Sequence, residues 1–405
     1  MIGPYWSRLE YWSELKYRQG ENWTMNRLMA LSVICGCVVL AGGCGSSSNG
    51  NRIAMVTDSG GTTGSAEVSA IYSGIESYAA DHSLTTGIYT AAADTEEEFA
   101  AQFKAAADDH AGYVVCTGEN MESAVYGAQD SQRDQYYLYF NGVPRRGSDE
   151  DGTIRSNTEC FRYDVEDMAF LAGYAAVGGG YRNIMYMTGD KSDGHIACRD
   201  SFMQGIEKAV SSLGITSDSL RVSEEYAGSA LVSPLRMTDA INAYDSGVDL
   251  IVTDEPGIAK SIEAAAGSRS KYVATIGFDE LGNSSSVVFS AIGNGNTAVQ
   301  YVLNSVLKEK GFEGGTLKTC GAKERAIGLS ADYSRMASFD ESACSGILDA
   351  MAEGTAASAG EDGASALQLS FSVTEVEPVT PDGTAGLEPP PTAPPEGAAA
   401  STASA

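Results

Sequence analysis

The stretch VDLIVTDEPGIAKSIEAAAGSRSKYVATI, residues 248–276, holds two short apolar runs separated by a longer amphipathic one. Residues 248–252 and 272–276 are rich in β-branched side chains, a composition that predicts strands. Residues 258–266 carry apolar side chains at helical spacing. A strand, a helix and a second strand predict a βαβ unit whose parallel strands are covered on both faces by helices.

The same alternation recurs from about residue 51 to about residue 354. Further strands are expected at residues 53–57, 112–116, 136–140, 183–187, 220–224 and 287–290. Further helices are expected at residues 68–80, 96–107, 167–177, 197–213, 234–244 and 298–310. The pattern predicts an α/β fold with two doubly wound parallel-sheet lobes joined by a hinge.

Composition divides the chain further. We expect residues 1–24 to be an upstream start artefact, 25–43 a signal peptide, 44–50 a flexible linker and 355–405 a disordered tail. The first lobe is expected to comprise residues 51–160 plus about 280–320, and the second residues 161–279 plus about 321–354. Within the tail, residues 367–373 form a short apolar stretch, and an added strand is the alternative there.

The segment before Cys44 is typical of a secretory signal, with a basic start, an apolar run at residues 28–40 and then small residues. The run is too short for a dependable transmembrane span. Because it ends on a cysteine followed by a Gly/Ser linker, the segment resembles a bacterial lipoprotein signal, whose cleavage leaves Cys44 lipidated. Ala41 stands where the usual pattern has leucine, and the alternative is an ordinary signal with Cys44 a plain thiol.

The chain is strongly acidic, with 26 Lys+Arg against 54 Asp+Glu and a net charge of −28. This balance excludes a nucleic-acid-binding surface, which needs clustered Lys and Arg. It also makes anionic solutes less favoured ligands. With three histidines no His-rich metal site is expected, and no cofactor is implied.

Polar residues follow nearly every predicted strand, and ligands of open parallel sheets bind at the carboxyl ends of the strands. The ligand-binding candidates are Asp58, Ser59, Thr62, Glu119, Asn141, Asp254 and Asp279. The alternative is that these residues only form turns and cap helices.

Motifs of enzymes are absent from the sequence, including Gly-x-Gly-x-x-Gly, Gly-Lys-Ser/Thr, Gly-x-Ser-x-Gly and His-Glu-x-x-His. His195 is interpreted as a surface residue or a ligand contact. No nucleophile, base and orienting group can be named together, so we predict that the protein is not an enzyme. Among the cysteines after the linker, Cys320 and Cys344 are the preferred disulfide if the compartment is oxidising.

Five short motifs occur in order along about residues 51 to 350. They are Val56-Thr-Asp-Ser-Gly-Gly61 leading to Gly74, Phe170-Leu-Ala-Gly-Tyr174, Phe202-Met-Gln-Gly205, Gly257 before Ile262-Glu-Ala-Ala265, and Ile276-Gly-Phe-Asp279. Together they resemble the basic membrane protein family, the PnrA-like receptors. The resemblance implies a type I periplasmic-binding-protein fold and a substrate-binding lipoprotein of an ABC importer, often for purine nucleosides.

The resemblance also implies a ligand set, which this chain keeps only in part. Asp279 matches the aspartate that binds ribose hydroxyls. The family's Asp-Asp and Phe-Asn after the first strand are replaced by Thr63, Gly64, Glu67 and Val68. The second stacking aromatic corresponds to Cys198, the base-reading aspartate to Asn141 and the ligand lysine to Gly293.

We therefore expect a lipid-anchored, extracytoplasmic solute-binding protein of an ABC importer at the cell membrane. Its partners would be a small polar solute, with a nucleoside favoured, an ABC permease, and the membrane through the lipid anchor. The alternative is a surface sensor or adhesion lipoprotein that has kept the fold without a transport role.

Overall fold

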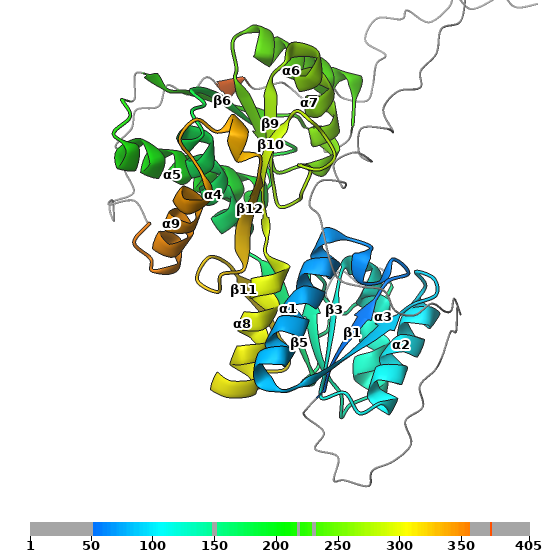
Figure 1. Ribbon diagram of the computed structural model, residues 1–405. Helices are drawn as coiled ribbons and strands as arrows, with labels where there is room; N and C mark the ends of the chain where they lie inside the picture. The colour runs from blue at the N-terminus through cyan, green and yellow to red at the C-terminus, as the bar shows by residue number, and fades with distance from the viewer. Residues whose placement is uncertain (1–51, 148–151, 217–218, 229–231, 357–372, 375–405) are drawn as a thin grey trace, which may run out of the picture. The chain divides into compact units, whose positions relative to one another are not determined.

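The computed structural model describes residues 52–147, 152–216, 219–228, 232–356 and 373–374. Two sheets with their helices form in this part of the chain (Figure 1). The predicted signal peptide, Cys44, the linker and nearly all of the tail lie outside the described residues.

The first sheet has six strands among the described residues, in the order β11-β5-β4-β3-β1-β2, with all neighbours parallel. Its strands are β1 (Arg52–Thr57), β2 (Thr85–Thr90), β3 (Tyr113–Thr117), β4 (Tyr136–Phe140), β5 (Thr158–Tyr163) and β11 (Thr316–Cys320). Its helices are α1 (Ala66–His82), α2 (Glu96–Asp108), α3 (Glu122–Ser131) and α8 (Gly295–Asn304), with the short turns η1 (Gly61–Thr63) and η2 (Glu119–Met121) and the π-helical turn η4 (Ser305–Glu309).

Successive side chains of β1 point to opposite faces of the sheet, as in any strand, and therefore pack into two different hydrophobic cores. Ile53 and Met55 pack with α1 and α8, whereas Ala54 and Val56 pack with α2 and α3 on the opposite face. Figure 1 shows the two pairs of helices on either side of this sheet. The predicted parallel sheet with helices on both faces is therefore confirmed for the first lobe.

The second sheet has the order β12-β10-β9-β8-β6-β7-β13 among the described residues, and only β10 with β12 is antiparallel. Its strands are β6 (Asn183–Thr188), β7 (Arg221–Tyr226), β8 (Leu250–Thr253), β9 (Tyr272–Ile276), β10 (Val287–Gly293), β12 (Ile327–Ala331) and β13 (Val373–Thr374). Its helices are α4 (Val165–Gly178), α5 (Asp193–Leu213), α6 (Pro234–Asp245), α7 (Pro256–Arg269) and α9 (Glu341–Ala352), with the short turn η5 (Tyr333–Arg335).

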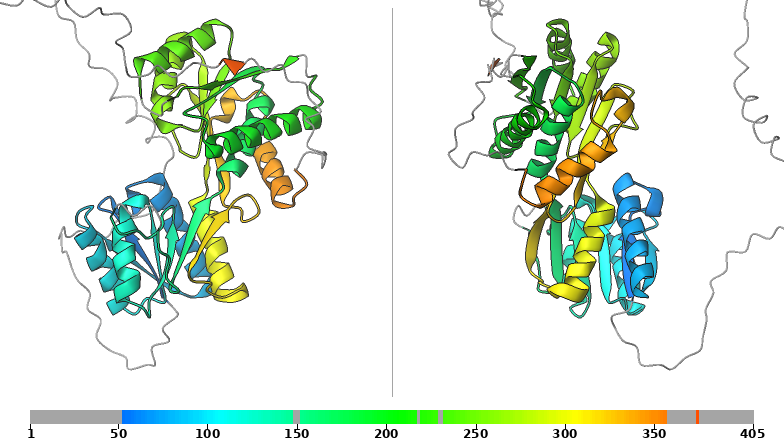
Figure 2. Two further views of the ribbon diagram at one scale, coloured as in Figure 1. Left: turned by 180° about the vertical axis from the view of Figure 1, so that it is seen from behind. Right: turned by 60° about the vertical axis from the view of Figure 1, so that its left-hand side comes forward.

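Helices again cover both faces of this sheet. One core includes residues of α4, α5 and α9, and the other includes residues of α6 and α7 (Figure 2). Two expectations change here. β10 pairs with β9 inside the second sheet, so the chain returns to the first lobe at residue 294 and not near residue 280. Val373–Thr374 of the tail pair with β7, so the alternative of an added strand holds for Val373, the last residue of the stretch at residues 367–373.

Three connections carry the chain between the sheets, and hydrogen bonds link the connections to one another. The first begins at Asp164, whose side chain caps α4 by accepting from the amides of Glu166 and Asp167. The carboxylate of Asp167 accepts from the amide of Ala322 at 2.8 Å in the third connection. The amide of Asn294 in the second connection donates to the carbonyl of Ala326 at 2.7 Å.

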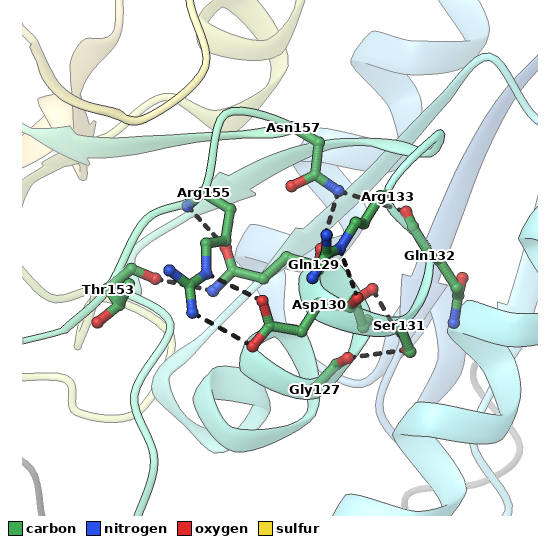
Figure 3. Close-up of polar contacts among 10 residues, drawn as sticks. Gly127, Gln129, Asp130, Ser131, Gln132, Arg133, Thr153, Arg155 and Asn157 are labelled. Carbon is green, nitrogen blue, oxygen red and sulfur yellow. Dashed lines mark hydrogen bonds and ion pairs between the residues drawn. The ribbon is translucent and has the colours of Figure 1, made fainter.

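A polar network fastens the amino end of β5 to α3 (Figure 3). The buried Gln129 donates to the carbonyl of Thr153 at 2.8 Å and accepts from the amide of Arg155 at 3.0 Å. The amide group of Asn157 reaches three carbonyls at the end of α3, and Arg155 pairs with Asp130 at 2.9 Å.

Candidate functional site

Glu67 is the centre of a polar cluster at the carboxyl ends of β3, β4 and β5. It lies in the first turn of α1, where Ser65 caps the helix. The Oε1 atom of Glu67 accepts from the Thr117 hydroxyl at 2.9 Å and from the Asn141 Nδ2 at 2.5 Å. The Tyr163 hydroxyl lies close enough to interact with the same carboxylate. Four elements of the first lobe therefore converge on one carboxylate.

The electrostatics of this cluster follow from its burial. Burial raises the pKa of the Glu67 carboxyl, and hydrogen bonds from Thr117 and Asn141, with the nearby Tyr163 hydroxyl, oppose that rise without cancelling it. Burial also raises the pKa of the Tyr163 phenol, and the charge of Glu67 adds to the effect. The phenol therefore keeps its proton across the physiological range.

The backbone at the ends of β3 and β4 is tightly specified. Asn141 has a φ of 51°, in the left-handed region that asparagine tolerates better than most residues. A Cβ at Gly142 would lie 2.1 Å from the Tyr139 hydroxyl, which itself donates to the carbonyl of Gly118 at 2.7 Å. These contacts hold the Asn141 side chain in the position where it meets Glu67.

Four other predicted residues lie on loops of the same lobe. Asp58 follows β1 and accepts from the amide of Gly60 at 3.0 Å, so part of its hydrogen-bonding capacity shapes the turn. The amide of Ser59 donates to Asp94 at 2.7 Å. Thr62 lies in η1 and the exposed Glu119 in η2. Among the described residues the cluster around Glu67 includes Asn141 but none of these four.

Asp254 follows β8 and belongs to a second cluster, in the other lobe. Its carboxylate lies near the Tyr186 phenol of β6 and the Cys198 thiol of α5. Burial, then the neighbouring thiol and carboxylate, raise the pKa of the Tyr186 phenol. In the described part of the chain, Asp254 Oδ1 and the Tyr186 hydroxyl have no well-formed hydrogen bond.

His195 lies beside this second cluster. Its Nδ1 is 2.9 Å from Asp190 Oδ1 and its Nε2 is 3.7 Å from Glu255 Oε2. Burial disfavours the charged imidazole, but the charge of Asp254 and hydrogen bonds to Asp190 prevail and raise the pKa of His195. Asp279, by contrast, is exposed after β9, and its Oδ1 accepts from the amide of Leu281 at 3.0 Å.

The predicted disulfide does not form. Cys320 belongs to the core of the first sheet and Cys344 to a core of the second, and both are free thiols. Burial raises the pKa of the Cys320 thiol to about 12, which makes it an inert packing residue.

Two cavities in the described residues lie away from the predicted ligand-binding residues. One of about 310 Å³ lies between β5, β11, α8 and η4, and another of about 360 Å³ is lined by residues 281–285, Val287, Asp332 and Arg335. Neither includes a ligand-binding candidate. We therefore locate the candidate site at the polar side chains that converge at the carboxyl ends of the strands, because ligands of open parallel sheets bind there. In the described residues no group of three or more His, Cys, Asp or Glu could hold a metal ion, and none of the described helices is long and apolar enough to cross a membrane.

Glu67, Thr117 and Tyr163 are the residues of the first cluster that the sequence interpretation did not propose as ligand-binding. Glu67 was noted only as the replacement of a stacking ring, although its place two residues after Ser65 and just before the first predicted helix was a usable signal. Tyr163 was missed because β5 was not predicted; the aromatic and β-branched run that ends at the acidic helix cap could have indicated it.

Residues 52–349 match the family model described as ABC transporter substrate-binding protein PnrA-like. No curated protein matches the sequence. The fold is similar to a solute-binding protein of an ABC transporter system from Conexibacter woesei DSM 14684, with a TM-score of 0.52, 16% identity and coverage of 75% of this chain and 95% of that one. It is also similar to a transcriptional activator of the comK gene from Bacillus halodurans, with a TM-score of 0.51, 11% identity and coverage of 75% and 97%. Identities this low show a shared fold alone.

Proposed function

Because the chain belongs to the family of PnrA-like ABC transporter substrate-binding proteins, we propose that it is the lipid-anchored receptor of an ABC importer for a nucleoside or a similar small polar solute. The family is one of extracytoplasmic solute-binding proteins and not of enzymes. The nucleoside, the importer and the lipid anchor are the parts that the proposal adds.

One observation carries the proposal. Glu67, Thr117 and Asn141 come from three separate elements, and hydrogen bonds hold them together at the carboxyl edge of the first sheet. Turn formation accounts for one carboxylate oxygen of Asp58 and one of Asp279, which accept from amides two residues along the chain. It does not explain a half-buried carboxylate that gathers side chains 50 and 74 residues away. A binding site for a polar ligand does explain this arrangement, because such a site needs a small number of polar groups held in fixed orientations.

Closure of the two lobes on the solute is the proposed mechanism of capture. Two of the three connections between the sheets are short: Asp164 joins β5 to α4, and Asn294 joins β10 to α8. Residues at the ends of helices and strands can absorb the changes in backbone angles of a hinge rotation. A closed receptor would then present the solute to its permease. The lobes would contribute Asn141 with Asp58, Ser59, Thr62 and Glu119 from one side, and Asp254 with Asp279 from the other.

Calorimetric titration tests the binding role. The purified chain, stripped of bound ligand by unfolding and refolding, is titrated with nucleosides, nucleobases, sugars and amino acids. We expect one nucleoside or related solute to bind, and Asp279→Ala to weaken it about tenfold, since a lost hydrogen bond to a polar ligand is worth about 1.4 kcal/mol. Asp81→Ala, at an exposed aspartate near the end of α1, is the matched control and should leave affinity unchanged.

Two results would count against this proposal. Tight nucleoside binding with the same affinity in Asp279→Ala would show that Asp279 is not part of the site. Absence of binding to every solute of the panel would favour the alternative function, a surface sensor or adhesion lipoprotein. That alternative is supported by the replacement of the family's two stacking aromatic rings by Glu67 and Cys198.

The lipid anchor is tested separately. Cys44 lies outside the described residues, and the proposal rests on the sequence pattern before it. In a bacterial host, Cys44→Ala is expected to move the protein from the membrane fraction to the soluble extracytoplasmic fraction, because the net charge of −28 supplies no attraction to anionic lipid. Metabolic labelling with a fatty acid should mark the parent protein and not the variant. Equal labelling of both would show that the lipid is attached elsewhere.

A further inference from the structure

We propose that residues 367–374 of the chain's own tail dock as a strand on the outer edge of β7, and that this strand closes the second sheet against pairing with other chains. The structure describes the end of this strand, Val373–Thr374, as β13. The inference concerns a docking surface on the second lobe and does not depend on the identity of the solute.

The docking surface is the edge of β7 that faces away from β6. On one side, β6 pairs with β7 over six residues, whereas on the other side β13 pairs with it at Glu224 and Glu225. Among the described residues, Arg221–Ser223 have no strand partner on that outer side. An open strand edge presents unpaired amides and carbonyls, to which another extended segment can add.

The sequence of the tail supplies a strand that fits this edge. Residues 367–374 read LQLSFSVT, in which apolar side chains occupy every second position from Leu367 to Val373. Strict alternation is typical of a strand with one apolar face. The stretch also has no charged residue and no proline, in a chain of net charge −28. Because a segment of this kind is prone to aggregate when it is left unpaired, docking protects the segment as well as the edge.

The register of β13 places the apolar series on the face that is already apolar. Val373 lies opposite Glu224, which faces α5 and pairs there with Arg199 at 2.7 Å. Continuing the pairing backward places Phe371 opposite Val222, a residue of the core that includes α5. Opposite residues of paired strands share a face, so the apolar series would extend this core. A shift of one residue would turn the whole series to the other face of the sheet.

The chain between the last helix and the strand is long enough to reach this edge. The carbonyl of Thr355 accepts from Lys208 of α5 at 3.1 Å, and Ala356 is buried in the core that includes Val222. The ten residues 357–366 lead from this point to the proposed strand and can span about 35 Å when extended. A short tether keeps the segment at a millimolar effective concentration beside its own edge, which favours it over the tail of a second copy.

Paired cysteines test the register and the occupant together. Ser372→Cys with Ser223→Cys, and Ser370→Cys with Arg221→Cys, place thiols at opposite positions of the proposed pair. Phe371→Cys with Ser223→Cys, one residue out of register, is the matched control. The pairs are built in the full chain with Cys44→Ala, oxidised mildly and mapped by mass spectrometry. We expect both matched pairs to cross-link within one molecule, and the control at least about tenfold less, because a disulfide needs close and convergent Cβ atoms.

Truncation tests what the strand does for the edge. A chain that ends at Ala366 loses the strand, whereas a chain that ends at Val376 keeps it and loses the rest of the tail. Hydrogen exchange at the β7 amides that do not donate to β6 should become at least about tenfold faster in the shorter chain and stay unchanged in the longer one. Sedimentation should show self-association of the shorter chain alone.

Three results would overturn the inference. A disulfide between two copies would show that a neighbour's tail occupies the edge. Equal cross-linking of matched and control pairs, or β7 exchange that is the same in both truncated chains, would show that the tail does not lie along β7. A shorter chain with fast β7 exchange that stays monomeric would show that the strand does not protect the sheet from other chains.

Discussion

Gly173→Ala is expected to destabilise the second lobe by about 3 kcal/mol, the upper end of the usual cost of overpacking. A Cβ at Gly173 in α4 would lie 2.0 Å from the carbonyl oxygen of Phe202 in α5. A Cβ at Gly205 would lie 2.0 Å from the carbonyl oxygen of Phe170. The two helices therefore cross backbone to backbone through a pair of glycines, and no side-chain rotation can relieve the clash.

Urea unfolding of the variant measures this cost, with Gly127→Ala as the control. Gly127 lies in α3, and a Cβ there meets nothing within 4 Å. Alanine should stabilise that helix by about 0.5–1 kcal/mol, because glycine is the poorer helix former. Gly173 and Gly205 belong to two of the motifs that carry the family resemblance, so the prediction also gives those motifs a physical cause. Equal effects of the two substitutions would disprove the close crossing.

Glu225→Gln is expected to stabilise the protein at pH 8 by about 3 kcal/mol and to change it little at pH 4. Glu225 lies in β7 and is only 6% exposed. Burial, and then the charge of Asp239, raise its pKa to about 7, while Arg236 opposes the rise. The Nη1 of Arg236 is 3.2 Å from Asp239 but 3.9 Å from Glu225, so the arginine favours the other carboxylate.

The pH dependence follows from this raised pKa. Between the usual pKa of 4.5 and the folded value of about 7, the folded state holds more protons than the unfolded state. The contribution of Glu225 to stability therefore falls as pH rises through this window and is lowest above it. Each unit is worth about 1.4 kcal/mol, which gives roughly 3 kcal/mol over the window.

Thermal or urea unfolding of wild type and variant from pH 4 to pH 8 measures the difference. The two curves should converge at the acid end and separate above pH 7. Glu97→Gln, at an exposed glutamate, should run parallel to wild type. A constant offset between Glu225→Gln and wild type at every pH would show that Glu225 titrates normally.

Strands that are buried on both faces were predicted well. The runs at residues 136–140 and 272–276 have the bounds of β4 and β9, because continuous apolar side chains are needed only where helices cover both faces. The edge strands β2 and β11 were not predicted. Apart from Cys320, no side chain of either strand is buried, and the apolar signal is correspondingly weak.

The sequence by itself determined the class of fold, the alternation of elements and the edge of the sheet where polar residues gather, since these follow from local periodicity and from the common direction of parallel strands. Only the tertiary structure decided which of those residues meet. Glu67 reaches Thr117 and Asn141 across 50 and 74 residues of chain, and local sequence patterns do not show that contact. The free thiols of Cys320 and Cys344 and the raised pKa of Glu225 have the same origin: each depends on distances and burial that arise between elements remote in sequence.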